Sequence, residues 1–582
     1  MIKLLKNLSK KEWLYFLFSV VLVVLQVWLD LKLPDYMSNI ARLITTNGTV
    51  FQVLEQGLYM LSCAFGSLIL AFIVGYFASY IGTSFAKKVR ATVFNKIEDF
   101  GMGEIKNFST SSLITRTTND VTQVQMLIAM GLQAIIKAPI LAIWAILKIV
   151  NKNFEWSIIT GGAVFLLLLL VVIIIVFALP KFKKIQKLTD NLNKIIIENL
   201  TGIKVVKSFN AENYQQNKFN EANTLLTKTD LYVQRIMSLM SPFMSFLMPV
   251  LTLCIYFIGS YLINDATMPD KFILFSDMIV FSSYSMQIIM AFMMLIMIFI
   301  IYPRASVSAK RILEVLETKV SIVDGSKKNN SSQKGTIEFK KVSFKYPDAL
   351  EYMLKDISLK INKGETVAFI GSTGSGKSTL INLIPRFYDV TEGEILVDGI
   401  NVKDYKLTDL YDKLGYISQK AVLFNGTVKE NIAYGDKIIK EEDMKKAIDV
   451  AQGTEFVLKM EKQYDSHIAQ SGTNISGGQK QRLSIARAIA RNPEIYLFDD
   501  SFSALDYKTD SILRKELKNH TKDATILIVA QRIGTIKNAD KIVVLDDGII
   551  VGDGTHKELL NSCEVYKEIA YSQLSKEELE NE

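Results

Sequence analysis

Cysteine is scarce in this chain, which has three cysteines among 582 residues. Cys63 and Cys254 fall within long apolar stretches, and Cys563 lies near the C-terminal end. Their spacing matches no metal-ligand pattern, and three scattered thiols cannot form a disulfide framework. The sequence therefore excludes a small disulfide-stabilised domain, and we expect these thiols to be buried or idle.

A signal-peptide cleavage site is also missing. Lys3, Lys6, Lys10 and Lys11 precede the first apolar stretch, as in the charged start of a signal peptide. No small-residue cleavage site follows this stretch, and five more apolar stretches come after it. We therefore predict that the first stretch is a retained membrane helix.

Long apolar runs dominate the first half of the chain. A helix needs about 20 apolar residues to cross the hydrocarbon core of a bilayer. Because the number of spans is even, both termini are expected on the same side of the membrane. The stretches that qualify are six: Trp13–Leu33, Leu58–Tyr80, Leu127–Val150, Ser157–Leu179, Pro242–Asn264 and Ile273–Tyr302.

The positive charges indicate which side is cytoplasmic. The net charge is +8, and the lysines flank apolar spans, so we expect the membrane surface to be their partner and expect no nucleic acid. The inner loops, 81–126 and 180–241, hold sixteen Lys and Arg residues, against two in the shorter outer loops. Both termini are therefore predicted to be cytoplasmic. The inner loops look helical and are expected to extend the membrane helices into the cytoplasm.

Five ionisable residues lie in or near the predicted spans: Asp30, Lys32, Lys137, Lys148 and Asp277. Such groups are costly in a bilayer and usually face a cavity or a charged partner. Asp30 and Lys148 are the better candidates for a cavity. Lys137 and Asp277 could equally lie near an interface and extend towards water.

The last predicted span is rich in methionine. Met286, Met290, Met293 and Met297 recur at the spacing of one helical face. Methionine is flexible and polarisable, and it recurs on surfaces that bind diverse ligands. The face could line a substrate path, but ordinary packing between helices is the favoured explanation.

The composition changes after the last span. The polar segment Lys327–Gln333 reads as a linker, and from about Gly335 the sequence has the pattern of a soluble α/β domain. We therefore predict an all-α six-helix membrane domain at 1–315, a linker at 316–335 and an α/β P-loop domain at 336–582.

The strongest motif follows a short apolar run, Thr366–Ile370, and precedes a helical pattern. It fits the phosphate-binding G-x-x-x-x-G-K-[ST] loop, in which backbone N–H groups and a helix N-terminus cradle phosphates. In this loop Lys377 is expected to reach the β- and γ-phosphates of ATP, and the Ser378 hydroxyl to bind Mg²⁺. The loop comprises Gly371, Ser372, Thr373, Gly374, Ser375, Gly376, Lys377, Ser378 and Thr379.

Further polar residues follow other short strands. Tyr346 ends a strand pattern and could stack on a purine ring, and Gln419 follows the run Leu414–Ile417. Asp499 and Asp500 close a buried run, where a carboxylate can hold Mg²⁺ through its water shell. Gln531 follows another such run. A second anion-binding turn before a helix is predicted at Ser476, Gly477, Gly478 and Gln479.

In order and spacing these motifs resemble those of an ABC exporter half-transporter, and the likeness covers nearly the whole chain. The resemblance implies ATP and Mg²⁺ as cofactors, with Tyr346 as the adenine-contacting residue, Asp499 as the Walker B carboxylate and Ser476–Gln479 as the signature. It also implies that Gln419 contacts the metal and acts with Asp500 and Gln531 in hydrolysis. Segments 108–120 and 198–223 resemble the two intracellular loops, whose short coupling helices dock on nucleotide domains in that family.

Three residues depart from the family pattern. Asp500 stands where the family has a glutamate general base, Gln531 where it has the switch histidine, and Gln470 where a glutamate is expected upstream of the signature. An aspartate falls about 1 Å short of the attacking water, and a misplacement of that size can cost about 100-fold in rate. Glutamine also cannot carry the charge of a protonated histidine. The combination resembles the degenerate half of a heterodimeric bacterial exporter.

The resemblance implies a membrane-embedded ATPase in the bacterial cytoplasmic membrane that works with a second half-transporter and moves a drug-like solute, lipid or peptide. A homodimer that exports a lipid or peptide is the alternative, and a non-transporting sensor or regulated channel on the same fold is another. A soluble ABC ATPase of translation or repair is excluded by the six spans. ATP-dependent flux of substrate in sealed vesicles would separate a pump from a sensor.

Overall fold

The computed structural model describes residues 2–6, 8–46, 48–150, 154–328, 334–435, 439–521 and 523–574. These residues form two compact units. Unit 1 comprises residues 1–96 and 111–317, and unit 2 comprises residues 97–110 and 318–582. The chain therefore passes between the units at Lys96, at Thr110 and at Glu317.

Unit 1 is all-helical, and six of its helical stretches are long and apolar enough to cross a membrane. This confirms the prediction of six apolar spans. The helical character predicted for the inner loops is also confirmed, because α3 and α7 run on as helices of 49 and 48 residues. The helices are α1 (Ile2–Leu5), α2 (Lys10–Thr45), α3 (Val50–Glu98), α5 (Thr110–Thr117), α6 (Asn119–Val150), α7 (Phe154–Thr201), α8 (Ile203–Ser208), α9 (Glu212–Ser238), α10 (Met240–Asp265) and α11 (Met268–Glu317).

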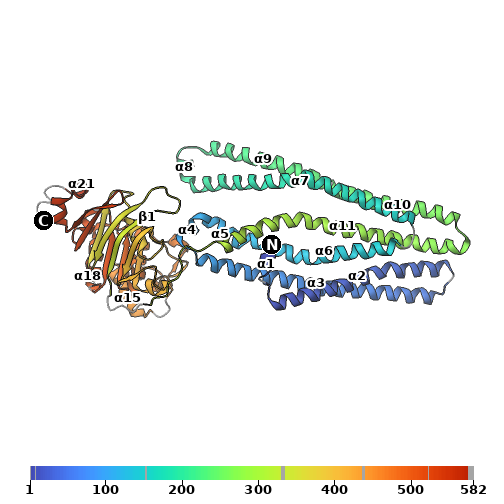
Figure 1. The fold of residues 1–582 in the computed structure, drawn as a ribbon, viewed down its shortest axis with the longest axis horizontal. Helices are drawn as coiled ribbons and strands as arrows, with labels where there is room; N and C mark the ends of the chain where they lie inside the picture. The colour runs from blue at the N-terminus through green and yellow to red at the C-terminus, as the bar shows by residue number, and fades with distance from the viewer. Residues whose placement is uncertain are drawn as a thin grey trace. The chain divides into compact units, whose positions relative to one another are not determined.

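Within unit 1, α6 packs along α11, and α2 packs against both of them (Figure 1). Their shared core contains Val27, Ala145 and Phe281, which are fully buried. On α7, by contrast, Phe165 and Val172 are exposed, as expected for a helix surface that faces lipid rather than water. The apolar residues of α7 thus fit a membrane span better than a soluble core.

The ionisable residues of the spans are paired. The Lys137 ammonium lies 3.0 Å from the Asp30 carboxylate, and the Lys148 ammonium lies 2.8 Å from that of Asp35. The Tyr284 hydroxyl donates to Asp35 at 2.6 Å. Lys137 was expected to be able to extend towards an interface, but it instead joins α6 to α2 through Asp30. Pairing lowers the cost of placing these charges among apolar helices.

Unit 2 contains a six-stranded sheet in the order β12-β11-β3-β10-β9-β6 and a four-stranded antiparallel sheet in the order β2-β1-β4-β5. In the larger sheet β11, β3, β10, β9 and β6 run parallel. The strands are β1 (Ile337–Phe344), β2 (Leu354–Ile361), β3 (Thr366–Gly371), β4 (Glu392–Val397), β5 (Ile400–Asn401), β6 (Leu414–Ile417), β7 (Gly426–Thr427), β8 (His467–Ile468), β9 (Ile495–Asp499), β10 (Thr525–Val529), β11 (Lys541–Asp546) and β12 (Ile549–Gly554).

Every residue of β9 and β10 is buried, which explains why these strands read as continuous apolar runs in the sequence. Helices complete the unit: α4 (Met102–Phe108), α12 (Lys377–Leu383), α13 (Leu407–Lys413), α14 (Val428–Ile432), α15 (Glu441–Val450), α16 (Thr454–Leu458), α17 (Gly477–Ala490), α18 (Tyr507–His520), α19 (Ile533–Ile536), α20 (His556–Ser562) and α21 (Glu564–Gln573). The six-helix and α/β architecture is thus the one predicted.

Two features refine the predicted linker. Helix α11 continues to Glu317, and the Lys327 amide donates to the Asp404 carbonyl oxygen at 2.8 Å, so this part of the segment is docked on unit 2. Residues 329–333 of the predicted linker lie outside the described residues. Unit 2 also includes α4, which the sequence places between two membrane helices.

Candidate active site

The predicted site residues meet at one edge of the larger sheet of unit 2. The phosphate-binding loop follows β3, Asp499 is the last residue of β9, Gln531 comes just after β10, and Gln419 follows β6. These strands are parallel neighbours in the order β3-β10-β9-β6, so their carboxyl ends lie together. This is the edge at which ligands bind in open α/β sheets.

The phosphate-binding loop requires glycine at two positions. Gly371 has φ of 153°, and a Cβ atom there would lie 1.9 Å from the Leu545 carbonyl oxygen. Gly376 precedes α12 with φ of 94°, and its Cβ atom would lie 2.7 Å from Leu354. Any larger residue would therefore displace the loop from β11 or β2. The glycines keep backbone N–H groups available beside the N-terminus of α12.

The Lys377 ammonium lies inside this loop. It donates to the carbonyl oxygen of Gly371 at 2.9 Å and to that of Ser372 at 2.6 Å. Burial lowers the pKa of this lysine, while the charges of Asp499 and Asp500 oppose that shift. The loop thus holds a desolvated positive charge at its centre, which suits a nucleotide phosphate.

Asp499 and Ser378 bring two oxygen donors together. The Ser378 hydroxyl donates to the Asp499 carboxylate at 2.6 Å, and burial raises the pKa of that carboxyl. Hydroxyl and carboxylate oxygens are the ligands that Mg²⁺ prefers, and Mg²⁺ in such sites needs only one or two protein ligands besides phosphate and water. The donor set therefore fits Mg²⁺.

Asp500 has an unusual backbone conformation, and two side chains donate hydrogen bonds to one of its carboxylate oxygens. Its φ is 47°, in the left-handed region that non-glycine residues seldom adopt. One carboxylate oxygen, Oδ2, accepts from the Gln419 amide at 3.1 Å and from the Gln531 amide at 2.9 Å. Burial raises the pKa of this carboxyl, and the Gln419 hydrogen bond opposes that shift. All three residues predicted to act in hydrolysis are therefore in direct contact.

The predicted adenine-contacting residue, Tyr346, lies beside the same loop. Its hydroxyl is 2.9 Å from the Thr379 hydroxyl, and its ring meets the Tyr388 ring edge-on at 5.3 Å. The Lys106 ammonium of α4 lies 6.0 Å from the centroid of the Tyr346 ring and 3.6 Å from Asp348. An aromatic ring and a cation thus border the place where the adenine base of ATP is expected.

The predicted signature forms the start of α17. The Ser476 hydroxyl accepts a hydrogen bond from the backbone N–H of Gln479 at 3.3 Å. The side-chain oxygen of Gln479 in turn accepts from the backbone N–H of Ser476 at 2.9 Å. These two hydrogen bonds form a capping box. The space around the neighbouring Gly477 is open, because a Cβ atom there would meet nothing within 4 Å. Among the described hydrogen bonds, none joins this turn to the phosphate-binding loop.

Two residues at the site were not predicted. Asp546 ends β11, and its carboxylate accepts from the Ser372 hydroxyl at 3.3 Å. The sequence signal was the same as for Asp499, a carboxylate that closes a buried apolar run. Tyr388, which supports Tyr346, lies in a loop, and no local pattern marks it.

The chain matches two family models. The model described as the ABC transporter transmembrane region matches residues 16–317, and the model described as ABC transporter matches residues 354–503. An uncharacterized ABC transporter ATP-binding protein of Mycobacterium tuberculosis is 36% identical over 94% of this chain and 93% of its own length. An uncharacterized ABC transporter ATP-binding protein of Bacillus subtilis is 36% identical over 90% of this chain and 89% of its own length.

Two further similarities concern export. A Staphylococcus aureus protein, provisionally named a multidrug export ATP-binding/permease protein, is 32% identical over 86% of each chain. A solved structure of a bacterial Atm1-family ABC exporter with ATP bound has a TM-score of 0.81 and covers 97% of this chain and 98% of its own, at 22% identity. That structure establishes an exporter fold. This chain is therefore a member of the ABC transporter family, a multi-pass membrane half-transporter whose ATPase domain couples ATP hydrolysis to transport.

Proposed function

We propose that this chain is one half of a dimeric exporter and that the ATP site built on its own Walker B strand turns over slowly. The observation that carries the proposal is the contact of Gln419 and Gln531 with one oxygen of Asp500. The exported solute would be drug-like, by analogy with the provisional name of the Staphylococcus aureus relative, and a lipid or a peptide is the alternative that the family resemblance implies.

A general base must reach the attacking water with a free lone pair. Asp500 is one methylene shorter than glutamate, and two amide donors already occupy its Oδ2 atom. These hydrogen bonds direct Oδ2 towards the two glutamines and away from a water molecule. Gln531 cannot place a positive charge on the γ-phosphate, and phosphoryl transfer depends on positioning and charge. Slow turnover follows from all three effects.

ATP binding does not depend on these groups. The residues that would hold the nucleotide are Lys377, with its desolvated charge, and Tyr346 beside Thr379. Ser378 and Asp499 would hold Mg²⁺, which supplies positive charge beside the phosphates when bound. The chain should therefore bind ATP tightly and hydrolyse it slowly.

The signature turn supports a role for a second chain. Ser476–Gln479 has the intact capping box of an anion-binding helix start, and Gly477 leaves it sterically open. In the family, each ATP lies between the phosphate-binding loop of one chain and the signature of the other. The signature of this chain would thus complete the ATP site of its partner, a second half-transporter.

The surface of the second intracellular loop also supports a partner. Phe209 and Tyr214, in and just after the short segment that follows α8, have exposed fractions of 79% and 68% within the described residues. Large apolar side chains on a cytoplasmic loop usually mark an interaction site. We infer that this loop is the second coupling loop. We further propose that the chain divides into a membrane domain at 1–315, a linker at 316–335 and a nucleotide-binding domain at 336–582. We also propose the bacterial cytoplasmic membrane, with both termini cytoplasmic.

The test compares the purified chain alone with the chain co-expressed with its partner half, in sealed vesicles. We expect the chain alone to bind a fluorescent ATP analogue and to show very slow ATPase. Brisk ATPase by the chain alone would contradict the slow site and favour a homodimer. ATP binding without ATP-dependent flux of a panel of fluorescent dyes and lipids would favour a sensor.

A further inference from the structure

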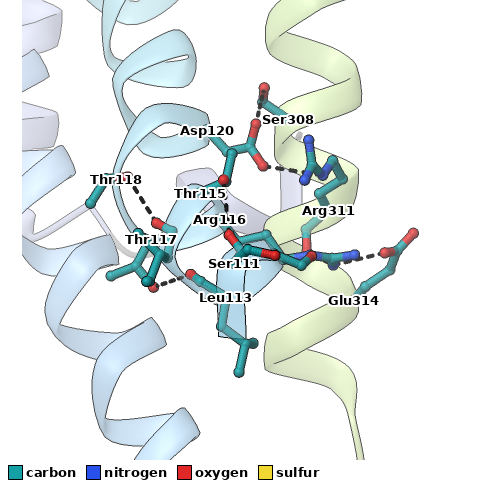
Figure 2. A network of polar contacts seen from close by, with 12 residues as sticks. Ser111, Leu113, Thr115, Arg116, Thr117, Thr118, Asp120, Ser308, Arg311 and Glu314 are labelled. Atoms are coloured by element: carbon teal, nitrogen blue, oxygen red, sulfur yellow. Dashed lines mark hydrogen bonds and ion pairs between the residues drawn. The ribbon is translucent and has the colours of Figure 1, made fainter. Parts of the chain in front are cut away.

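A cluster of charged side chains joins the start of α6 to the end of α11 (Figure 2). Asp120, in the first turn of α6, is only 3% exposed. Its carboxylate accepts from the Ser308 hydroxyl at 2.8 Å and lies 3.3 Å from Nε of Arg311. A buried carboxylate on one helix is thus hydrogen-bonded to one residue and ion-paired with another residue of a helix that is distant in the sequence.

Arg116 of α5 makes the second link. Its guanidinium donates to the backbone carbonyl oxygen of Arg311 at 2.6 Å and to the Glu314 carboxylate at 2.8 Å (Figure 2). The Arg116 side chain is 12% exposed. Arg116 and Asp120 are four residues apart in the sequence, and they hold one face of α11, on which Ser308, Arg311 and Glu314 recur every three residues.

This cluster lies close to two of the points at which the chain passes between the two units. The chain passes from unit 2 to unit 1 at Thr110, just before Arg116, and passes back to unit 2 at Glu317, just after Glu314. The cluster therefore ties together two of the three covalent connections between the units. At the remaining connection, α3 contacts α6 through Arg90, whose hydrogen bonds to Thr122 and Gln125 are 3.3 and 3.5 Å long.

Charged side chains are not needed merely to hold these helices together. Val121 and Ile312 are fully buried near the same contact, and apolar residues alone can hold two helices together. A buried ion pair is often no more stabilising than apolar side chains of similar volume. It does, however, favour one register, because a slip would leave the buried Asp120 carboxylate without its ion-pair partner. The cluster thus favours a joint in which α5, α6 and α11 move together without sliding.

We propose that Arg116 and Asp120 are positioning residues for coupling: they make the first intracellular loop and the end of α11 move as one body when ATP acts on unit 2. A shift delivered at Thr110 then reaches α6 directly and α11 through the two side chains. This inference rests on the ATP-driven transport of the family. It does not depend on the slow ATP site or on the nature of the partner.

The test is hydrogen–deuterium exchange of the full-length chain in nanodiscs, with its partner half where one is required, with and without ATP and Mg²⁺. In the wild type we expect ATP to change exchange in both the α4–α5 segment and the cytoplasmic part of α11. In Arg116→Gln and in Asp120→Asn, the change in α4–α5 should persist and the change in α11 should shrink to the part that its own connection at Glu317 transmits. Asp120→Asn keeps an acceptor for Ser308, which favours a folded protein.

A matched control is Lys218→Gln, which breaks the 2.9 Å ion pair between Lys218 and Glu198 in the other intracellular loop. This variant should keep the wild-type response of α11. The double variant Arg116→Gln/Glu314→Gln should behave like Arg116→Gln alone, because both changes remove the same link. ATP affinity should be unchanged in every variant.

An α11 response of wild-type size in both Arg116→Gln and Asp120→Asn would overturn the inference while leaving ATP-driven transport intact. A wild type in which ATP changes neither segment would contradict ATP-driven coupling itself, and the inference with it. The two failures are therefore distinguishable in one experiment.

Discussion

Unit 2 carries two surfaces that are proposed to bind ATP, and they differ in how far their residues keep the family pattern. At the sheet edge, Asp500 is hydrogen-bonded by two glutamines and no histidine is present at position 531. At the start of α17, the signature turn is capped and open around Gly477. Under the proposed function, this difference means that one domain would hold a weakened set of catalytic groups and an intact turn that faces the partner. Each surface can therefore be altered independently.

The largest expected effect comes from the signature surface. Gly477→Asp places a negative charge where the partner's nucleotide phosphates would lie, so ATP turnover by the co-expressed pair should fall by about 100-fold or more. The space around Gly477 is open, so the fold should be retained. Steady-state ATPase of the pair measures the effect.

Two control variants separate charge from folding in this experiment. Gly477→Ala fits the same open space without a charge and should retain most of the turnover. Thr555→Ala removes a capping box of the same type at α20 and should cost stability, about 1 kcal/mol, without lowering turnover. If Gly477→Ala lost turnover as completely as Gly477→Asp, backbone geometry and not charge would be responsible.

The next effect concerns the other surface. Lys377→Ala removes the buried ammonium of the phosphate-binding loop, so affinity for a fluorescent ATP analogue should fall by about 10- to 100-fold, as expected for loss of a charged hydrogen bond. Lys340→Ala removes an exposed lysine that pairs with Glu394 and should leave affinity unchanged. Equal binding by wild type and Lys377→Ala would contradict the predicted site.

A smaller effect is expected at Asp500. Because the Walker B site of this chain should turn over slowly, Asp500→Asn should lower the ATPase of the pair less than twofold. The paired change Asp500→Glu with Gln531→His removes both departures and should raise turnover. Loss of activity in Asp500→Asn as severe as in Gly477→Asp would remove the distinction between the two surfaces.

The smallest effect is expected outside unit 2. Met290 is 51% exposed on α11, whereas Met293 packs against the buried core of unit 1. Leucine keeps the volume of methionine and removes its flexibility, so Met290→Leu should alter the profile of transported dyes while ATP binding stays constant. Met293→Leu serves as the packing control. A dye profile that responds only to Met293→Leu would favour packing over a substrate path.

Much of the site could be predicted from local sequence because its residues lie at the carboxyl ends of buried strands. Thr366–Ile370 and Ile495–Phe498 read as buried strands, and parallel strands bring their carboxyl ends to one edge. The sequence therefore places the phosphate-binding loop, Asp499 and Gln531 at the ends of such strands.

Other features needed the structure because they join distant elements. The sequence marks Lys137 and Asp30 as charged residues in spans but does not show that they pair across two helices. Nor does it show that both Gln419 and Gln531 donate to the same oxygen of Asp500. The inclusion of α4 in unit 2 is similarly a result of folding over a long sequence distance.

The two ion pairs between α2 and α6 have a consequence for biogenesis. An isolated charge at the centre of a membrane helix costs about 2.5–3.5 kcal/mol on insertion scales. The carboxylates on α2, Asp30 and Asp35, leave the ribosome before their lysine partners on α6, Lys137 and Lys148. We expect α2 to be retained at the insertion machinery until α6 arrives, which crosslinking of arrested nascent chains ending before or after α6 would reveal. On this expectation, charge neutralisation between α2 and α6 would set the release of these helices into the lipid, and the chain would enter the bilayer in groups of helices.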